Sequence, residues 1–130
     1  MAVNPGANAT QWGLCWRESG TGELITVGIQ LINTGVVRVV SYDWASPTDG
    51  APSANFEFVG SSHMPTSWIR LTDNGTNRIS QISADGQHWL TLLTEGRTTF
   101  LTADEVGFFA YQSSTAVPDP VATLLSWAQT

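Results

Sequence analysis

The chain has 130 residues, of which 42% are hydrophobic and 12% are charged, a composition that predicts one folded domain and not a disordered chain. Five arginines and no lysine stand against eleven acidic residues, for a net charge of −6. This balance excludes nucleic-acid binding through a basic face, Schiff-base chemistry and a P-loop lysine. The single cysteine excludes an internal disulfide and a cysteine-based zinc cluster.

The sequence indicates neither a signal peptide nor a membrane-spanning helix. The first residues, Met1 to Gly6, lack the basic and apolar regions of a signal peptide. No apolar run approaches the roughly 18 residues that a membrane helix requires. We therefore expect no contact with a membrane.

The chain begins with residues 1–11, whose Asn, Ala, Pro and Gly content is typical of an arm or loop, and residues 12–130 are the predicted single domain. The clearest strand signal runs from Ile25 to Leu31, where apolar residues alternate with Thr, Gly and Gln. Such alternation predicts a half-buried antiparallel strand. Similar patterns predict further strands over residues 12–17, 36–44, 55–59, 67–72, 77–83, 87–94, 98–101, 106–112 and 121–128.

Turn signals separate these strands. Asn74-Gly75 and Asp85-Gly86 each predict a tight turn, because Asn and Gly accept a positive φ at low cost. Residues 102–105 predict one helical turn, and no longer amphipathic helix is indicated. Eight to ten short strands with such turns are typical of an all-β sandwich or barrel.

A succession of short motifs resembles the concanavalin A-like (laminin-G/glucanase-like) sandwich family. The motifs cover roughly residues 13–128 and are Gly13-Leu14-Cys15-Trp16-Arg17-Glu18-Ser19, Trp68-Ile69-Arg70-Leu71, Asp73-Asn74-Gly75, Ser83-Ala84-Asp85-Gly86-Gln87-His88-Trp89 and Val106-Gly107-Phe108. The resemblance implies a two-sheet antiparallel β-sandwich of the jelly-roll type. Family members carry further N-terminal strands, which are missing here, so either the sandwich is reduced or another chain supplies an edge.

The sequence does not predict an enzyme. The family's hydrolases carry an E-x-D-x-x-E strand, which is absent, and the adjacent Asp104 and Glu105 point to opposite faces of a strand. Distant carboxyl pairs could meet in the fold, for example Asp43 with Glu57, but solvated surface acids are the simpler interpretation. Two loop histidines, His63 and His88, have no G-x-S-x-G elbow beside them. Cys15 is interpreted as a buried packing residue.

Six tryptophans suggest a carbohydrate-binding surface or a core rich in tryptophan. Trp44 is expected to be exposed, because it ends a strand and opens the loop over residues 45–55. The candidate carbohydrate-binding residues are Tyr42, Asp43, Trp44, Asn55 and Tyr111. The remaining tryptophans, Trp12, Trp16, Trp68, Trp89 and Trp127, are expected in the core.

Calcium is the one metal that the sequence suggests, since it prefers oxygen ligands from loops. The candidate ligands are Asp49, Asp73 and Asn74, although turn formation is a sufficient reason for all three. No other cofactor is predicted.

The leading hypothesis is a non-enzymatic structural or binding module. The resemblance implies a virion-associated protein, because reduced sandwiches low in lysine recur in bacteriophage capsid decoration, head-fibre and tail-appendage proteins. We expect the chain to form a homo-oligomer or to bind another virion protein, with glycan binding as a compatible activity. The alternative is a lectin-like carbohydrate-binding domain of an exported, extracellular protein or enzyme.

Overall fold

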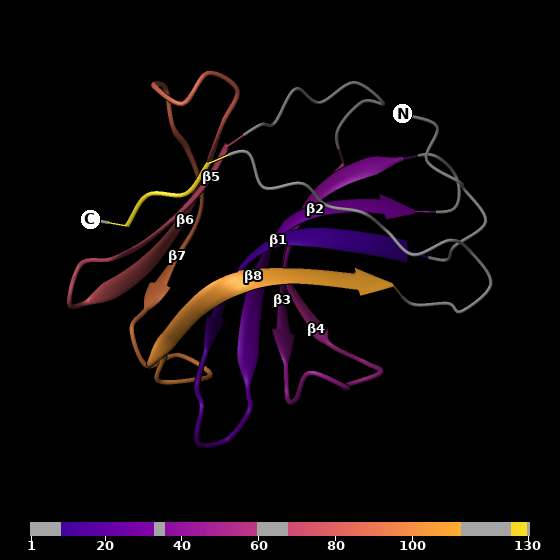
Figure 1. Cartoon of the computed structure of the whole chain (residues 1–130), viewed down its shortest axis with the longest axis vertical. Coiled ribbons are helices and arrows are strands. Elements are labelled where there is room, and N and C mark those ends of the chain that lie inside the picture. The colour runs from indigo at the N-terminus through magenta and orange to yellow at the C-terminus, as the bar shows by residue number, and fades with distance from the viewer. Residues whose placement is uncertain (1–8, 33–35, 60–67, 113–125, 130) are drawn as a thin grey trace.

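Two antiparallel sheets make up the fold. The computed structural model describes residues 9–32, 36–59, 68–112 and 126–129 (Figure 1), and within these ranges it contains eight strands and no helix. The predicted class, an all-β arrangement of two antiparallel sheets, is therefore confirmed. No helix in the described ranges is long and apolar enough to cross a membrane.

The larger sheet has five strands in the order β4-β3-β2-β1-β8, and the smaller sheet has three in the order β5-β6-β7. The strands of the larger sheet are β1 (Ala9–Arg17), β2 (Leu24–Ile32), β3 (Val37–Trp44), β4 (Ser53–Val59) and β8 (Glu105–Gln112). Those of the smaller sheet are β5 (Trp68–Asp73), β6 (Asn77–Ser83) and β7 (Leu90–Gly96). All pairings within each sheet are antiparallel.

Three of the predicted segments differ from the structure. Residues 9–11 belong to β1 and not to an arm, because they continue its ladder with β2; residues 1–8 lie outside the described part. The strand expected at 98–101 is a turn, in which Thr99 N–H donates to Gly96 O and Leu101 is buried. Residues 126–129 are not a strand, and residues 121–125 of that prediction lie outside the described ranges.

The helical turn expected at 102–105 is also wrong. Glu105 already belongs to β8, and the link before it is held by side chains instead of helical hydrogen bonds. Thr102 N–H donates to Glu18 Oε2 at 2.7 Å, and Asp104 accepts from the backbone N–H of Ser19 at 2.8 Å and from its hydroxyl. These contacts tie the link between the sheets to the turn after β1.

The core lies between the two sheets. Ile29 and Val39 of the larger sheet pack with Ile82 of the smaller sheet, and Trp16 and Ile25 pack with Leu101. Burial of each such side chain stabilises the fold by about 1.5–3 kcal/mol. We call the face of the larger sheet that contacts the smaller sheet the near face, and its opposite the far face.

The far face of the larger sheet is also partly buried, which the sequence pattern did not predict. Every residue of β2 between its two ends is buried, including the polar Thr26 and Gln30. Val40, Tyr42 and Trp44 form a cluster on this face, with Tyr111 packed against it. The prediction of a half-buried strand at 25–31 is therefore wrong for β2, which is buried on both faces.

Candidate functional site

The aromatic platform predicted around Trp44 is not exposed. Trp44 is only 2% accessible, and its indole Nε1 donates a hydrogen bond to Thr26 Oγ1 at 2.8 Å. The Tyr111 ring packs edge-on against it, with ring centroids 4.8 Å apart. Alternation along β3 places Tyr42 and Trp44 together on the far face, where they pack with each other instead of facing solvent. The expected exposure of Trp44 is therefore wrong.

The Tyr42 hydroxyl forms a hydrogen bond with a side chain of the same sheet. Its hydroxyl donates to Glu57, whose other carboxylate oxygen accepts from Arg38 at 3.2 Å. Burial and the neighbouring Glu57 carboxylate raise the pKa of Tyr42 to about 12. Tyr42 therefore stays protonated and holds Glu57 on the far face.

Asp43 and Asn55, the two polar members of the predicted platform, do meet. The Asn55 side-chain amide donates to Asp43 Oδ1. Asp43 lies on the near face, because its neighbours Tyr42 and Trp44 occupy the far face and strand side chains alternate. The larger sheet thus separates the three aromatic candidates from the two polar ones. It also places Asp43 and Glu57, the distant carboxyl pair, on opposite faces.

A charged cluster that the sequence pattern did not predict lies between the sheets. The Arg78 side chain is 1% exposed and lies 3.7 Å from the Glu95 carboxylate, which is 14% exposed. One Arg78 nitrogen donates to the Thr99 carbonyl, whereas Nε and Nη1 have no partner among the described residues. Burial raises the pKa of Asp43 and of Glu95, and the Arg78 charge opposes both shifts. The signal available in the sequence was that Arg78 shares the parity of Ser80 and the apolar Ile82, which places all three on one face of β6.

The raised pKa values of Asp43 and Glu95 predict a pH dependence of stability. The folded protein binds these two protons more tightly than the unfolded chain, so their contribution is fully present below the ordinary pKa values of 3.8 and 4.5. It is lost as the pH rises through the raised values. We expect the wild type to lose stability relative to an Asp43→Asn, Glu95→Gln double variant as the pH rises from 3.8 toward neutrality. Urea unfolding over a pH series measures this difference, and a pH-independent difference would contradict it.

The predicted calcium ligands are occupied by their own turns. Asp49 accepts from the backbone N–H groups of Ala45 and Ala51 at 3.0 and 2.9 Å. Asp73 accepts from Gly75 N–H at 2.8 Å and from Arg97 at 2.7 Å. Backbone hydrogen bonds lower the pKa of both carboxyls.

Asn74 likewise accepts from the backbone N–H groups of Thr76 and Asn77. Within the described ranges, no group of three His, Cys, Asp or Glu side chains is placed to hold a metal ion. The side chains of Asp49, Asp73 and Asn74 therefore close turns, which is the role that the turn interpretation assigns to them.

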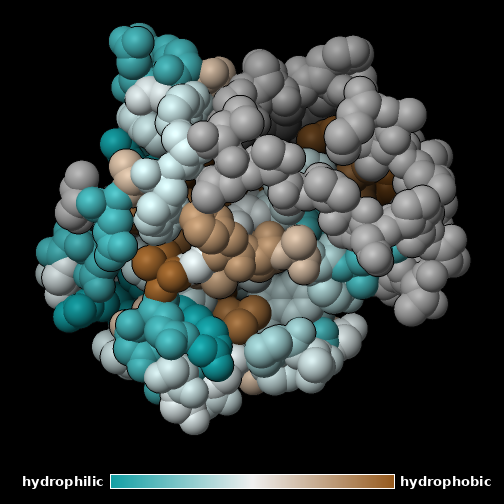
Figure 2. Space-filling view, viewed as in Figure 1, coloured by the Kyte–Doolittle hydropathy of each residue, from teal (hydrophilic) through white to brown (hydrophobic). Residues whose placement is uncertain are grey.

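The open edge of β8 carries exposed apolar side chains. Phe108 is 51% exposed and packs edge-on against Trp127, which is 45% exposed, with ring centroids 4.8 Å apart. Hydrophobic atoms gather along the middle of this side of the molecule in Figure 2, where β8 crosses it in Figure 1. Phe108 and Val106 lie on the near face, but the clusters between the sheets include no residue of β8. The three-stranded sheet is too narrow to cover this strand.

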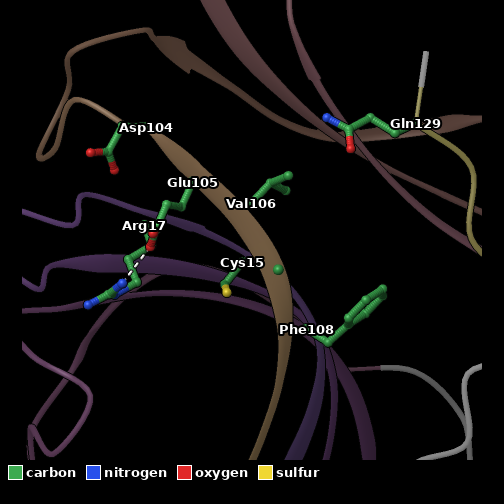
Figure 3. Close-up of a pocket in the computed structure, with 8 residues that line it drawn as sticks. Cys15, Arg17, Asp104, Glu105, Val106, Phe108 and Gln129 are labelled. Carbon is green, nitrogen blue, oxygen red and sulfur yellow. Dashed lines mark hydrogen bonds and ion pairs between the residues drawn. The ribbon is translucent and has the colours of Figure 1, made fainter.

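A shallow pocket of about 490 Å³ lies over the first half of β8. Figure 3 shows Val106 and Phe108 on one side of the strand, toward Gln129, and the Arg17–Glu105 ion pair with Cys15 on the other. Cys15 is buried, as expected, and burial raises the pKa of its thiol. The pocket therefore offers an apolar surface and one closed ion pair, with no activated nucleophile.

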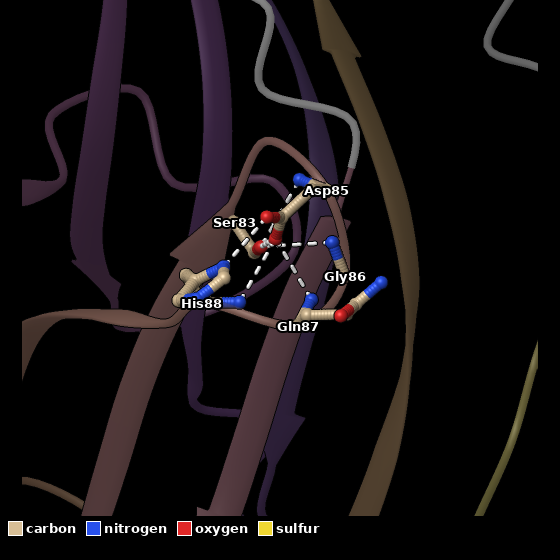
Figure 4. Close-up of polar contacts among 5 residues, drawn as sticks. All are labelled: Ser83, Asp85, Gly86, Gln87 and His88. Carbon is tan, nitrogen blue, oxygen red and sulfur yellow. Dashed lines mark hydrogen bonds and ion pairs between the residues drawn. The ribbon is translucent and has the colours of Figure 1, made fainter.

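The loop between β6 and β7 is built around Ser83 and Asp85 (Figure 4). The Ser83 hydroxyl accepts from Gly86 N–H at 2.9 Å, and Asp85 Oδ1 accepts from the N–H groups of Gln87 and His88 at 2.8 Å. Asp85 Oδ2 contacts the His88 ring at 2.7 Å. These donors hold the pKa of Asp85 far below its usual range. The motif residues thus form a loop closed by its own hydrogen bonds, and His63 lies outside the described residues.

Two tryptophans expected in the core are exposed instead. Trp68 is 44% exposed on the outer face of the smaller sheet, and Trp127 is exposed beside β8. Trp16 is buried, and Trp12 and Trp89 are half-buried. The signal for Trp68 was present in the sequence, since it shares the parity of the polar Arg70 and Thr72 along β5, whereas Ile69 and Leu71, of the other parity, face the core.

Comparison with known proteins adds no relative. No family model, curated protein or solved structure matches the chain. The two-sheet antiparallel arrangement is thus established by the structure itself. The concanavalin A-like resemblance, and the phage origin that it implies, stay interpretations of the sequence motifs.

Proposed function

We propose that the chain is a non-enzymatic assembly module in which β8 pairs with β8 of a second copy across a two-fold axis. The observation that carries the proposal is the open edge of β8. Among the described residues β8 pairs with β1 alone, so within these ranges the backbone N–H and C=O groups on its other side have no strand partner, and the exposed Val106 and Phe108 lie beside them. Such an edge accepts another strand.

The other three sheet edges are protected against such pairing. The register of β4 shifts opposite Ser41/Tyr42, and this strand carries Glu57. The register of β7 shifts opposite Ser80/Gln81, and β5 is short and carries Arg70. Bulges, charges and short strands all discourage edge-to-edge contact. In contrast, β8 has no register shift against β1 and no charged residue after Glu105.

The side chains of β8 are complementary to a second copy of themselves. In an antiparallel pair centred on Phe108, residues on the same face meet, so Val106 lies opposite Ala110 and Phe108 opposite its copy. On the other face Gly107 lies opposite Phe109. Each pair is apolar, and pairs of this kind contribute roughly 0.2–1 kcal/mol each. A second copy therefore suits this edge better than a charged partner.

The motif resemblance suggests where such a dimer would act. Reduced sandwiches low in lysine occur in phage virions, where repeated copies assemble on a surface, and we place the β8-linked dimer in such a decoration, head-fibre or appendage role. The fold by itself does not fix the function. The lectin alternative loses its original support, because Trp44 is buried.

The test is the solution mass of paired edge variants. We expect the wild type to show twice the chain mass of 14.0 kDa by light scattering from micromolar to millimolar concentration. Phe108→Lys should give a folded monomer, because two lysines would face each other at the axis. Phe58→Lys is the matched control, since Phe58 is 53% exposed on β4 at the opposite edge, and it should stay dimeric. A monomeric wild type, or dissociation by Phe58→Lys alone, would overturn the proposal.

A further inference from the structure

We propose that the outer face of the smaller sheet binds an acidic saccharide through Trp68, Arg70 and Trp89. This site lies on β5 and the loop before β7 and is separate from β8. It is independent of the assembly proposed above. Its ligand class follows from one cation, without a carboxylate partner in the described part of the chain, that lies beside an exposed indole.

Arg70 differs from the other arginines in having no carboxylate partner among the described residues. The remaining four all form ion pairs, which are Arg17–Glu105, Arg38–Glu57, Arg78–Glu95 and Arg97–Asp73. Acidic residues outnumber arginines eleven to five in the whole chain, so a surface arginine with no carboxylate partner in the described ranges is the exception that needs a reason. An external anion supplies one.

The guanidinium of Arg70 is held in a fixed orientation. Its central carbon lies 4.0 Å from the centroid of the Trp89 ring, and its Nε donates to Gln81 Oε1 at 2.9 Å. The amide of Gln81 in turn donates to Thr91 Oγ1 at 3.0 Å. Because Nε already donates to Gln81, the two terminal nitrogens of Arg70 remain available as a preorganised pair of hydrogen-bond donors, a fork. A planar fork of this kind binds a carboxylate through two parallel hydrogen bonds.

Trp68 provides an apolar surface next to this fork. It precedes Arg70 by two residues on the same strand face, which places the two side chains roughly 7 Å apart. Its ring lies against Gly86, where an added Cβ would be 3.1 Å from Trp68 Cε2. The hydrogen-bonded loop of Figure 4 therefore fixes the indole while leaving 44% of the residue exposed.

A carboxylated sugar matches this arrangement better than other anions. Its carboxylate pairs with the single Arg70 fork, and its C–H face stacks on the exposed Trp68 ring. Its hydroxyls meet hydrogen-bonding side chains, those of Gln81 and Thr91, instead of an apolar pocket. A nucleic acid would need several cations for its phosphates. The Asp85 carboxylate lies in the loop between β6 and β7. It already accepts hydrogen bonds from the backbone N–H groups of Gln87 and His88.

The experiment compares acidic with neutral sugars on the full chain. Trigalacturonate and its methyl-esterified form, and sialyllactose and lactose, are titrated while the indole N–H signals of Trp68 and Trp89 are followed by NMR. We expect at least one acidic sugar to bind about tenfold or more tighter than its neutral counterpart. The two pairs distinguish uronate from sialate. A lack of shifts at both indoles with every sugar would overturn the proposal.

Matched variants separate this site from general charge effects. Arg70→Gln should abolish the preference for the acidic sugar, and Trp68→Ala should weaken binding of both members of the pair. Arg97→Gln changes the net charge by the same amount and should leave binding unchanged, as should Phe108→Lys. Equal loss in Arg97→Gln, or equally tight binding of a tetraglutamate peptide, would contradict a saccharide site at Arg70.

Discussion

Replacing Arg78 with methionine is expected to lower the free energy of unfolding by about 3–5 kcal/mol at neutral pH. Arg78 is fully enclosed between the sheets, where it faces the partly buried carboxylates of Glu95 and Asp43. Removing the guanidinium leaves those two charges without a counter-charge in a medium that solvates them poorly. It also leaves the Thr99 carbonyl without its donor. Urea unfolding followed by tryptophan fluorescence measures the loss.

Two comparisons make this expectation specific to the buried charge. Arg97→Met removes an ion pair with Asp73 that has a shorter distance, 2.7 Å, but Arg97 is 54% exposed, so its loss should cost no more than about 1 kcal/mol. Adding Glu95→Gln to Arg78→Met should recover part of the stability, because one uncompensated carboxylate is removed. If Arg78→Met is as stable as Arg97→Met, the buried cluster contributes no more to the free energy of unfolding than an exposed ion pair does.

Substituting Gly28 with alanine is the second change with a large expected effect, about 3 kcal/mol or more. Gly28 lies directly opposite Gly13 at the centre of the larger sheet. An added Cβ at Gly28 would overlap the Trp12 backbone oxygen and lie 2.8 Å from the carbonyl carbon. Because these are backbone atoms of a paired strand, they move only if β1 and β2 separate. We expect a lower urea midpoint with an unchanged denaturant slope.

Gly20→Ala is the control for this substitution. Nothing lies within 4 Å of a Cβ added at Gly20, so its effect should stay within about 0.5 kcal/mol. If Gly28→Ala unfolds at the same urea concentration as the wild type, β1 and β2 do not approach as closely as the structure shows.

Several elements of the fold could be predicted because their signals are local. Alternation from Ile25 to Leu31 marked β2, and Asn74-Gly75 and Asp85-Gly86 marked turns in which Gly75 and Gly86 do have positive φ. The turn chemistry also explained Asp49 and Asp73, whose carboxylates accept from nearby backbone N–H groups. Local hydrogen bonds of this kind depend on neighbours a few residues away, so a short stretch of sequence is enough to predict them.

The candidate sites were harder to predict because exposure depends on what another segment covers. Trp44 and Trp68 stand at opposite ends of their strands, and both are large aromatic residues. Trp44 is enclosed by Tyr42 and Tyr111, whereas Trp68 lies on the outer face of a sheet only three strands wide. The residues that flank Trp44 and Trp68 in the sequence do not indicate which sheet each strand joins or how many strands that sheet has.

The sequence by itself determined the all-β class, the position of most strands and the identity of the turns, because alternation and glycine or asparagine preferences act over a few residues. The tertiary structure alone decided which side chains face solvent and which charges meet. Arg78 pairs with Glu95 on the neighbouring strand and its charge acts on Asp43 of the other sheet, whereas Arg70 is left without a carboxylate among the described residues. Those outcomes depend on strand order and sheet width, which set long-range contacts that no local pattern encodes.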